Sequence, residues 1–268
     1  MDMRSLPRPG FGTWQLTDAD ECVSCVRHAI ETGYRHIDTA VNYRNEESVG
    51  RGIAEASVDR DELFIATKIP TGSLGGAEVA QTADESLDRL GVDRIDLLYV
   101  HWPMRTYDAA ETLPAMAALV DDGKVDALGL SNFTPMLLDE AMDLAGDVII
   151  AHQYEKHPYL PNREVHRAST AHGLYSVAYS PLARGHVLDE ETIVSIASDR
   201  GITPAQVVLA WLHHDDDVVA IPKSSSHARI EENFAAGTHT LTDDEVARID
   251  AIEHRERLVD PDGAPWNR

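Results

Sequence analysis

Three residues that can take part in acid–base chemistry each close a short apolar segment of the sequence. They are Asp38, Lys68 and His101, and a tyrosine, Tyr43, lies just beyond Asp38. In a (β/α)₈ barrel the C-terminal ends of the strands line the open mouth, where catalytic residues lie. The pattern therefore indicates an enzyme whose site is built at strand ends.

These four side chains together can donate a proton to a carbonyl group that is being reduced. A tyrosine has an ordinary pKa of about 10, and we expect the Lys68 ammonium to lower the pKa of Tyr43. Asp38 keeps the lysine charged and in place, and His101 hydrogen-bonds the carbonyl oxygen. Taken singly, each residue could instead cap a helix, pack, or end a strand in solvent. Lysine is informative because the chain has four Lys against nineteen Arg, and a guanidinium does not readily replace a compact ammonium.

The elements that must position these residues follow from the hydrophobic pattern. Short continuous apolar runs, typical of parallel strands buried on both faces, alternate with segments of helical period. This pattern predicts one domain over residues 1–268, an α/β fold that is a single (β/α)₈ TIM barrel with two additional helices. No G-x-G-x-x-G follows a strand, so the sequence carries no Rossmann signal. We expect strands near residues 11–15, 35–39, 63–68, 95–101, 125–131, 148–153, 174–179 and 218–222.

Capping signals mark several helix starts. Thr17 precedes a helical pattern, and Thr134 and Thr203 each stand before a proline that suits the first helical position. Thr242 and Glu245 form a predicted capping box that opens a late helix. This late helix is one addition to the barrel. The second addition comes from the two helices expected at 191–200 and 204–214, because a barrel needs only one helix between its seventh and eighth strands.

Composition excludes several partners. The net charge is −23, with 46 acidic and 23 basic residues, which disfavours nucleic acid and anionic membranes. No apolar run approaches the ~20 residues of a membrane span, and Met1–Ser5 has no apolar signal core. We therefore expect a cytoplasmic monomer that acts on a small molecule. Dispersed charge with 27 Asp against 19 Glu predicts a halophilic origin; an ordinary acidic protein is the alternative.

Two further groups of residues could bind metal, but we predict no metal site. Cys22 and Cys25 have C-x-x-C spacing inside a helical pattern, and no second Cys pair completes a zinc site. His213-His214-Asp215-Asp216-Asp217 is interpreted as an exposed acidic turn, because no further ligand spacing supports a site.

The residues around the four candidate positions resemble the aldo-keto reductase family. Residues 33–46, which contain Asp38 and Tyr43, are similar to the first signature of that family. The resemblance implies a prokaryotic, short-loop reductase on a TIM barrel, which reduces an aldehyde or ketone with NADPH. It continues, in family order, through residues 66–68, 100–103, 129–133, 153–155 with 157–160, 179–182, 221–224, 229–233 and 258–261.

The resemblance also implies a role for each candidate. Tyr43 would be the general acid, Lys68 and Asp38 its tuning pair, and His101 the group that orients the carbonyl. Substrate contacts would come from Trp14, Tyr43, His101 and Trp102, and the three tryptophans Trp14, Trp102 and Trp266 would either wall the pocket or pack under loops.

A larger set matches the positions at which the family holds its cofactor. The carboxamide would be held by Ser131, Asn132 and Gln153, and Tyr179 would stack on the nicotinamide. The 2′-phosphate would lie between Lys223, Ser224 and Arg229, and the adenine would contact Glu232 and Asn233. The set also includes Gly12, Thr13, Trp14, Asp38, Ser180, Pro181, Leu182 and Ile221. Two cations beside a strand end suit phosphate in so acidic a chain, which favours NADPH over NADH; a solvated loop before a cap at Ser226 is the alternative.

Two other functions stay open at this point. One is an NADPH-binding, non-catalytic or regulatory subunit on the same barrel. The other is a metal-dependent barrel hydrolase that uses His101, His152 and Asp38, although its usual H-x-H pair after the first strand is replaced by Gly12-Thr13-Trp14. Sugars, 2-oxo-aldehydes, diketo-acids and simple aldehydes are all open as substrates.

Overall fold

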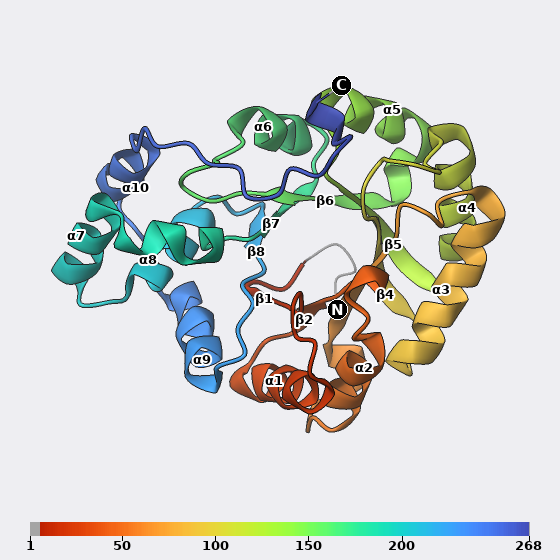
Figure 1. The fold of residues 1–268 in the computed structure, drawn as a ribbon, viewed down its shortest axis with the longest axis horizontal. Coiled ribbons are helices and arrows are strands. Elements are labelled where there is room, and N and C mark those ends of the chain that lie inside the picture. The colour runs from red at the N-terminus through yellow and green to blue at the C-terminus, as the bar shows by residue number, and fades with distance from the viewer. Residues whose placement is uncertain (1–5, 268) are drawn as a thin grey trace.

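The computed structural model describes residues 6–267 and has eight parallel strands around a central axis (Figure 1). Each strand pairs with the next in chain order, and Gly12 N donates to Pro222 O at 3.1 Å, which brings the two edges of the sheet together. This confirms the predicted (β/α)₈ barrel; the prediction made on Met1–Ser5 lies outside the described residues. The strands are β1 (Gly10–Gly12), β2 (His36–Asp38), β3 (Phe64–Ile69), β4 (Ile95–Val100), β5 (Val125–Ser131), β6 (Ile149–Glu155), β7 (Tyr175–Tyr179) and β8 (Val218–Ala220).

At least one α-helix follows every strand and covers the outside of the barrel (Figure 1). Two helices follow β7 and two follow β8, which gives the two predicted additions. The helices are α1 (Ala19–Thr32), α2 (Glu46–Ala54), α3 (Gly76–Leu90), α4 (Ala109–Asp121), α5 (Pro135–Ala145), α6 (Arg163–Ala171), α7 (Glu191–Arg200), α8 (Pro204–Leu212), α9 (His227–Ala235) and α10 (Asp243–Asp250).

The capping predictions hold with one exception. Thr134 and Thr203 cap α5 and α8 with proline at the first position, and Thr242 forms its capping box with Glu245. The exception is α1, which is capped by Asp18 and not by Thr17, because the Asp18 carboxylate accepts from Glu21 N at 2.9 Å. The limits of the first predicted strand are also wrong. It was expected at residues 11–15, whereas the strand in the structure is Gly10–Gly12.

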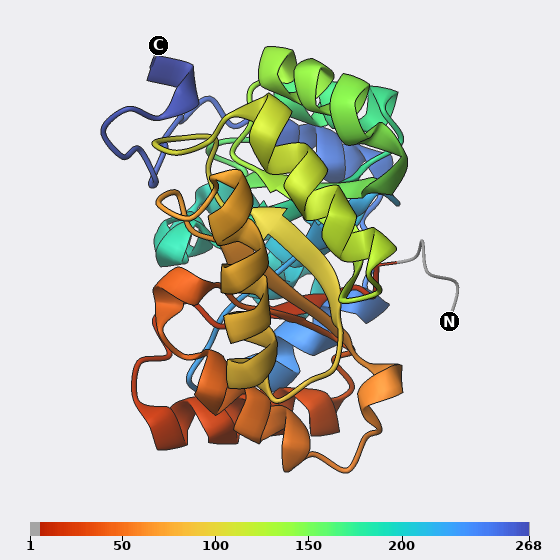
Figure 2. The same ribbon diagram turned by 90° about the vertical axis from the view of Figure 1, so that its right-hand side faces the viewer.

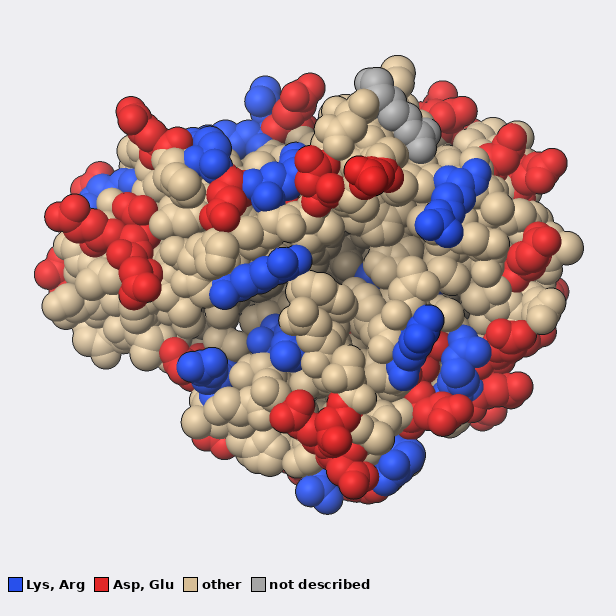
Figure 3. All heavy atoms as spheres, in the orientation of Figure 1, with Lys and Arg blue, Asp and Glu red and all other residues tan. Residues whose placement is uncertain are grey.

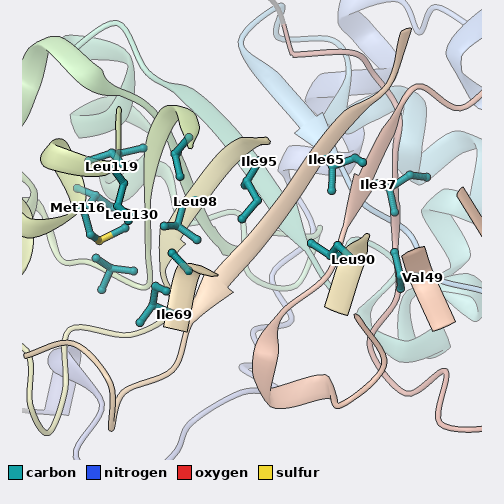
Figure 4. Close-up of a cluster of buried hydrophobic side chains, with 14 of the residues drawn as sticks. Ile37, Val49, Ile65, Ile69, Leu90, Ile95, Leu98, Met116, Leu119 and Leu130 are labelled. Atoms are coloured by element: carbon teal, nitrogen blue, oxygen red, sulfur yellow. The ribbon is translucent and has the colours of Figure 1, made fainter. Parts of the chain in front are cut away.

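Alternation along each strand separates two apolar layers. Side chains that point outward, such as Ile37, Ile65 and Leu98, pack against the helices in one large cluster (Figure 4). Cys22 and Cys25 of α1 are free thiols buried in that cluster, in agreement with their predicted packing role. Side chains that point inward form a separate cluster that fills the barrel, so the barrel is a packed core and its chemistry is confined to one end.

The strands all run toward one end of the barrel, and the C-terminal tail lies at that end. Figure 2 shows the blue tail on the side to which the yellow strand arrow points. Glu155, at the end of β6, is buried and accepts from the backbone N–H groups of Leu258 and Val259 at 2.8 and 3.0 Å. A buried carboxylate thus fastens the tail over the mouth. None of the helices between residues 6 and 267 is long and apolar enough to cross a membrane.

The interior layer next to the mouth depends on a glycine. A Cβ built on Gly129 of β5 would lie 2.3 Å from the ring of Tyr99 on β4, which is completely buried. We expect Gly129→Ala to overpack the barrel and lower the free energy of unfolding by about 1–3 kcal/mol in urea denaturation. Gly76→Ala is the matched control, because its added Cβ meets only Glu111 O at 3.9 Å. Equal stability of the two variants would contradict this packing argument.

Candidate active site

A cavity of about 930 Å³ opens at the strand ends, in the middle of the face shown in Figure 3. Lys and Arg side chains lie around the hollow, whereas Asp and Glu side chains are concentrated toward the periphery of this view (Figure 3). Asp38, Tyr43 and His101 all line the cavity, and so do all the residues predicted for cofactor contact. The strand ends thus gather the predicted set in one place.

An ion pair forms the floor of the cavity. Lys68 on β3 is completely buried, and its Nζ donates to Asp38 Oδ1 at 2.5 Å and to Thr39 O at 2.7 Å. Burial lowers the pKa of Lys68, and the Asp38 carboxylate opposes that shift. The second oxygen of Asp38 accepts from Gln153 Nε2 at 2.8 Å. Both oxygens are therefore engaged, and the lysine is fixed in position under the cavity.

Tyr43 ends a single turn of 3₁₀ helix, Val41–Tyr43, that follows β2. The next residue, Arg44, has a left-handed backbone with φ of 57°, which ends the turn. Asn45 holds the turn to the rest of the mouth, because its side-chain amide donates to Thr13 O at 2.9 Å and its oxygen accepts from Thr39 Oγ1 at 3.0 Å. Sequence reasoning did not single out Asn45, whose buried side chain joins the segments after β1 and β2.

The Tyr43 phenol lies over the ion pair but stays a weak acid. The Lys68 Nζ is 5.3 Å from the centre of the Tyr43 ring. The pKa of Tyr43 lies well above its ordinary value because the ring is buried and the Asp38 carboxylate is near. The expected lowering of this pKa is therefore wrong for the protein alone: the charge of Lys68 is already balanced by Asp38. At neutral pH the phenol keeps its proton.

His101 follows β4 and lies beside Tyr43. The two rings meet edge to face with their centres 5.9 Å apart. Burial and the nearby Lys68 ammonium lower the pKa of His101 to about 3, so the imidazole is neutral. Its Nδ1 is buried without a hydrogen-bond partner, and because a buried orphan N–H is costlier than a bare lone pair, we assign the proton to Nε2. A neutral ring with this tautomer is a hydrogen-bond donor at the cavity.

Hydrogen bonds across the mouth tie the other strand ends to His101. Asn132, just after β5, donates from its amide to His101 O at 3.0 Å and to Ser131 Oγ at 2.9 Å. Its amide oxygen accepts from Tyr179 Oη, at the end of β7, at 2.8 Å. Asn132 has φ of 65°, a left-handed conformation that asparagine tolerates. These contacts fix the predicted carboxamide and stacking positions relative to the candidate acid.

Two cations also line the cavity. Lys223 and Arg229 are among its lining residues, and neither forms an ion pair with any acid of the described chain. Ser224 Oγ accepts from Ser226 N at 3.0 Å, and the Ser226 side chain makes no capping bond to α9. The helix start therefore offers unpaired N–H groups beside two free cations, a combination that binds a phosphate group.

The cavity also has walls that sequence reasoning missed. Arg184 lies in the 3₁₀ segment Ala183–Asp189, with its guanidinium 4.9 Å from the centre of the Trp14 ring across the cavity. Val259 of the tail also lines the cavity. In the sequence, the one feature that pointed to Arg184 is that it follows Ser180–Leu182, which resembles the cofactor-binding residues of the family, by two residues. The remaining additions are Gln15, Asn42, Gly185, Leu188, Ala205 and Pro222.

The structure does not bring together the set of the hydrolase alternative. His152 is on β6 next to Gln153, so strand alternation turns it away from the barrel interior, and its Nδ1 lies 2.8 Å from Ser169 Oγ on α6. Burial lowers the pKa of His152 to about 3. Among the predicted walls, Trp14 and Trp102 line the cavity, whereas Trp266 packs on Trp102 from outside with ring centres 5.4 Å apart.

The turn with two histidines and three aspartates is held by other contacts. His213 Nε2 accepts from Ala220 N at 3.3 Å, and burial lowers the pKa of His213 to about 4. Asp216 pairs with Arg8 at 2.8 Å. These contacts give the turn a packing role next to β8.

Comparison with known proteins agrees with this geometry. A model of the "Aldo/keto reductase family" matches residues 10–254. The chain is 37% identical over 267 residues to an aldo-keto reductase of Mycobacterium sp. (strain KMS), covering 99% of this chain and 96% of that protein. It is 41% identical over 263 residues to the 2,5-diketo-D-gluconic acid reductase B of Corynebacterium sp. (strain SHS752001), covering 97% and 94%.

Solved structures give the same result. The crystal structure of a Bombyx mori aldo-keto reductase in complex with NADP superposes with a TM-score of 0.88 at 31% identity, covering 95% of this chain and 92% of that one. The similarity therefore extends over both the barrel and the residues at its mouth.

Proposed function

Because the chain belongs to the aldo/keto reductase family, we propose that it reduces an aldehyde or ketone to an alcohol with NADPH, using Tyr43 as the general acid. The observation that carries the proposal is the layout of one cavity. Tyr43 and His101 line it beside the buried Lys68–Asp38 pair, and so do Lys223 and Arg229, which form no ion pair within residues 6–267. A proton donor and a phosphate site thus share one continuous space.

Tyr43 supplies the proton. Its raised pKa keeps the phenol protonated, so the proton moves only when the substrate oxygen becomes more basic than a phenolate, as the alkoxide of a reduced carbonyl does. The Lys68 ammonium, 5.3 Å from the ring centre, then stabilises the phenolate that is left. Asp38 holds that ammonium in place, and His101 donates from Nε2 to the carbonyl oxygen and orients it.

The donor set fits a phosphorylated dinucleotide. Ser131, Asn132 and Gln153 give the cavity amide and hydroxyl groups, and Lys223 and Arg229 give it cations. When bound, NADPH supplies the hydride that reduces the carbonyl carbon. The walls that surround it, Trp14 and Tyr179 among them, exclude water from the reacting groups.

The substrate we propose is a small, polar carbonyl compound. A relative at 41% identity is a 2,5-diketo-D-gluconic acid reductase B, which supports a diketo-acid or related 2-oxo compound as the substrate class. The mouth is bordered by Trp102, by Arg184 and by Val259 of the tail. A cation beside apolar walls suits an acid with a short carbon skeleton.

The direct test is nicotinamide absorbance at 340 nm (the wavelength at which the reduced ring absorbs). Purified protein is mixed with NADPH, then with NADH, and with simple aldehydes, 2-oxo-aldehydes, sugars and diketo-acids in turn. Oxidation of NADPH that depends on the carbonyl compound is the expected result. Tight NADPH binding without turnover of any compound would instead favour the non-catalytic subunit, and absence of both would reject the proposal.

The preference for NADPH over NADH gives a specific prediction for Arg229. Arg229→Gln removes a charged donor to the 2′-phosphate, so we expect the KM for NADPH to rise about tenfold or more. The KM for NADH and the turnover at saturating cofactor should change little, because neither involves that phosphate. Arg248→Gln is the control, since Arg248 is exposed and its one side-chain hydrogen bond within residues 6–267 is to Ser195 Oγ at 3.2 Å. An equal loss for both cofactors would contradict the assigned role.

Further expectations from the sequence extend the proposal to the protein in its cell. We propose that the enzyme is cytoplasmic, that it is a monomer made of a single domain, and that it binds neither nucleic acid nor membranes. The excess of Asp over Glu and the net charge of −23 support a salt-rich environment. Thermal unfolding in dilute buffer and in molar salt tests this, and higher stability in dilute buffer would count against it.

A further inference from the structure

We propose that a second cavity, on the outer side of the barrel, binds a small organic anion through Lys156 and Arg167. This cavity of about 290 Å³ is lined by residues of α6, α8 and α10; in Figure 1, α6 lies at the top of the barrel and α8 and α10 at the left. It shares no lining residue with the cavity at the strand ends. The proposal is therefore independent of the reductase function.

Of the four lysines, Lys156 alone belongs neither to the candidate active site nor to an ion pair within residues 6–267. Lys68 and Lys223 belong to the candidate active site, and Lys124 forms a partly exposed ion pair with Asp84 at 2.6 Å. Lys156 is only 5% exposed and lines the second cavity. In a chain that otherwise uses arginine, a buried lysine indicates a need for a compact ammonium.

The buried ammonium has no carboxylate of the described chain in direct contact. Its Nζ donates to Pro161 O at 2.9 Å and lies 5.5 Å from the centre of the Trp211 ring. No carboxylate of residues 6–267 comes within 4.0 Å of it. Burial lowers its pKa to about 8, although the charges of Asp215 and Asp250, which lie beyond direct contact, oppose that shift. Buried charges are normally paired, and an ammonium has three N–H donors, so two are available to a ligand.

A second cation without a carboxylate lines the same cavity. The Arg167 guanidinium, on α6, makes one side-chain hydrogen bond, from Nε to Arg163 O at 3.2 Å. Its two outer nitrogens have no partner among the described residues, which leaves a planar fork suited to an oxyanion. Arg163, by contrast, is paired with Asp250 at 3.2 Å.

The two carboxylates of the cavity act on Lys156 only from beyond 4.0 Å, and both have other partners. Asp250 also accepts from Trp211 Nε1 at 3.2 Å, and Asp215 lies 3.5 Å from His166 Nε2. Because Arg163 is paired with Asp250, Lys156 and Arg167 are the two cations of the lining that have no carboxylate within 4.0 Å among residues 6–267. A ligand that brings its own negative charge can pair with both of them.

The walls define the ligand further. Trp211, Pro161 and Val246 give the cavity apolar surface beside its cations. Its volume is at the lower limit of ligand pockets, about 300 Å³. We therefore assign it to a carboxylate or phosphate group on a short carbon skeleton, the anionic oxygens being bound by Lys156 and Arg167.

Isothermal titration calorimetry tests the site with glycerol 3-phosphate and succinate as probes, in chloride buffer of constant ionic strength. Saturating NADP⁺ is included to block the phosphate site at Lys223. We expect one saturable binding event for at least one probe, and the probe that binds shows whether the site takes a phosphate or a carboxylate. Lys156→Met and Arg167→Gln should each lower the affinity for that probe at least tenfold. Lys124→Met, the matched control, should leave the affinity unchanged.

Two readouts separate binding from folding. The responding probe should raise the melting temperature of the natural protein but not that of Lys156→Met. Arg167 is exposed, so Arg167→Gln keeps the test valid if the buried substitution unfolds the protein. Absence of saturable binding for both probes, or equal affinity in the natural protein and the folded variants, would overturn the proposal.

Discussion

Replacing Tyr43 with phenylalanine is expected to lower turnover by about 10²–10⁴-fold while NADPH still binds, because a positioned proton donor contributes that much. The substitution removes one oxygen and keeps the ring that lies 5.3 Å from Lys68 and edge-on to His101. Steady-state kinetics with the best carbonyl substrate measures the loss. Quenching of tryptophan fluorescence by NADPH measures cofactor binding, which should stay within about threefold.

Tyr107→Phe is the matched control for this prediction. Tyr107 has a buried hydroxyl without a hydrogen-bond partner and packs on Phe133 away from the cavity. Loss of that hydroxyl should leave both turnover and melting temperature unchanged. If Tyr43→Phe retains turnover within tenfold of the natural protein, Tyr43 is not the proton donor. In that case His101, the other donor beside the Lys68–Asp38 pair, becomes the residue to replace.

Replacing Lys68 with methionine should abolish turnover and also destabilise the fold. The substitution leaves Asp38 buried with Gln153 as its remaining side-chain partner, and breaking a buried ion pair in this way costs about 3–5 kcal/mol. Urea denaturation measures this cost, and kinetics at a temperature where the variant is folded measures turnover. Lys124→Met, at an exposed ion pair, should change neither.

The double variant Lys68→Met with Asp38→Asn separates stability from catalysis. Removal of both charges eliminates the unpaired buried carboxylate, so most of the lost stability should return. Turnover should stay low, because no ammonium is left to stabilise the phenolate. If turnover returned together with stability, the ion pair would have only a structural role, and the proposed mechanism would have to be abandoned.

The strands could be predicted closely from sequence because parallel strands buried on both faces are continuous apolar runs. All eight appear, and Asp38, Lys68 and His101 fall at the ends of β2, β3 and β4 as expected. The strand ends converge because every strand of such a barrel runs in the same direction. The small errors lie at element ends, such as the cap at Asp18, where the position of one side-chain oxygen decides the boundary.

The charge state of the site could not be predicted in this way. Sequence reasoning expected the ammonium to lower the pKa of Tyr43, whereas burial and Asp38 raise it. The direction of the pKa shift depends on how deeply the Tyr43 ring is buried and on which group pairs with the Lys68 ammonium. Both are set by residues from several strands and loops, and neither leaves a local pattern.

The sequence alone determined the barrel, the family and the four residues at its mouth, because strand period and strand ends are local properties of the chain. Tertiary structure alone decided that Gln153 bonds Asp38, 115 residues away, and that Glu155 anchors Val259, 104 residues away. It also decided that Lys156 is buried without a carboxylate beside it. Desolvation and partner choice act between segments that are distant in sequence, so they are fixed only when the strands and helices pack together.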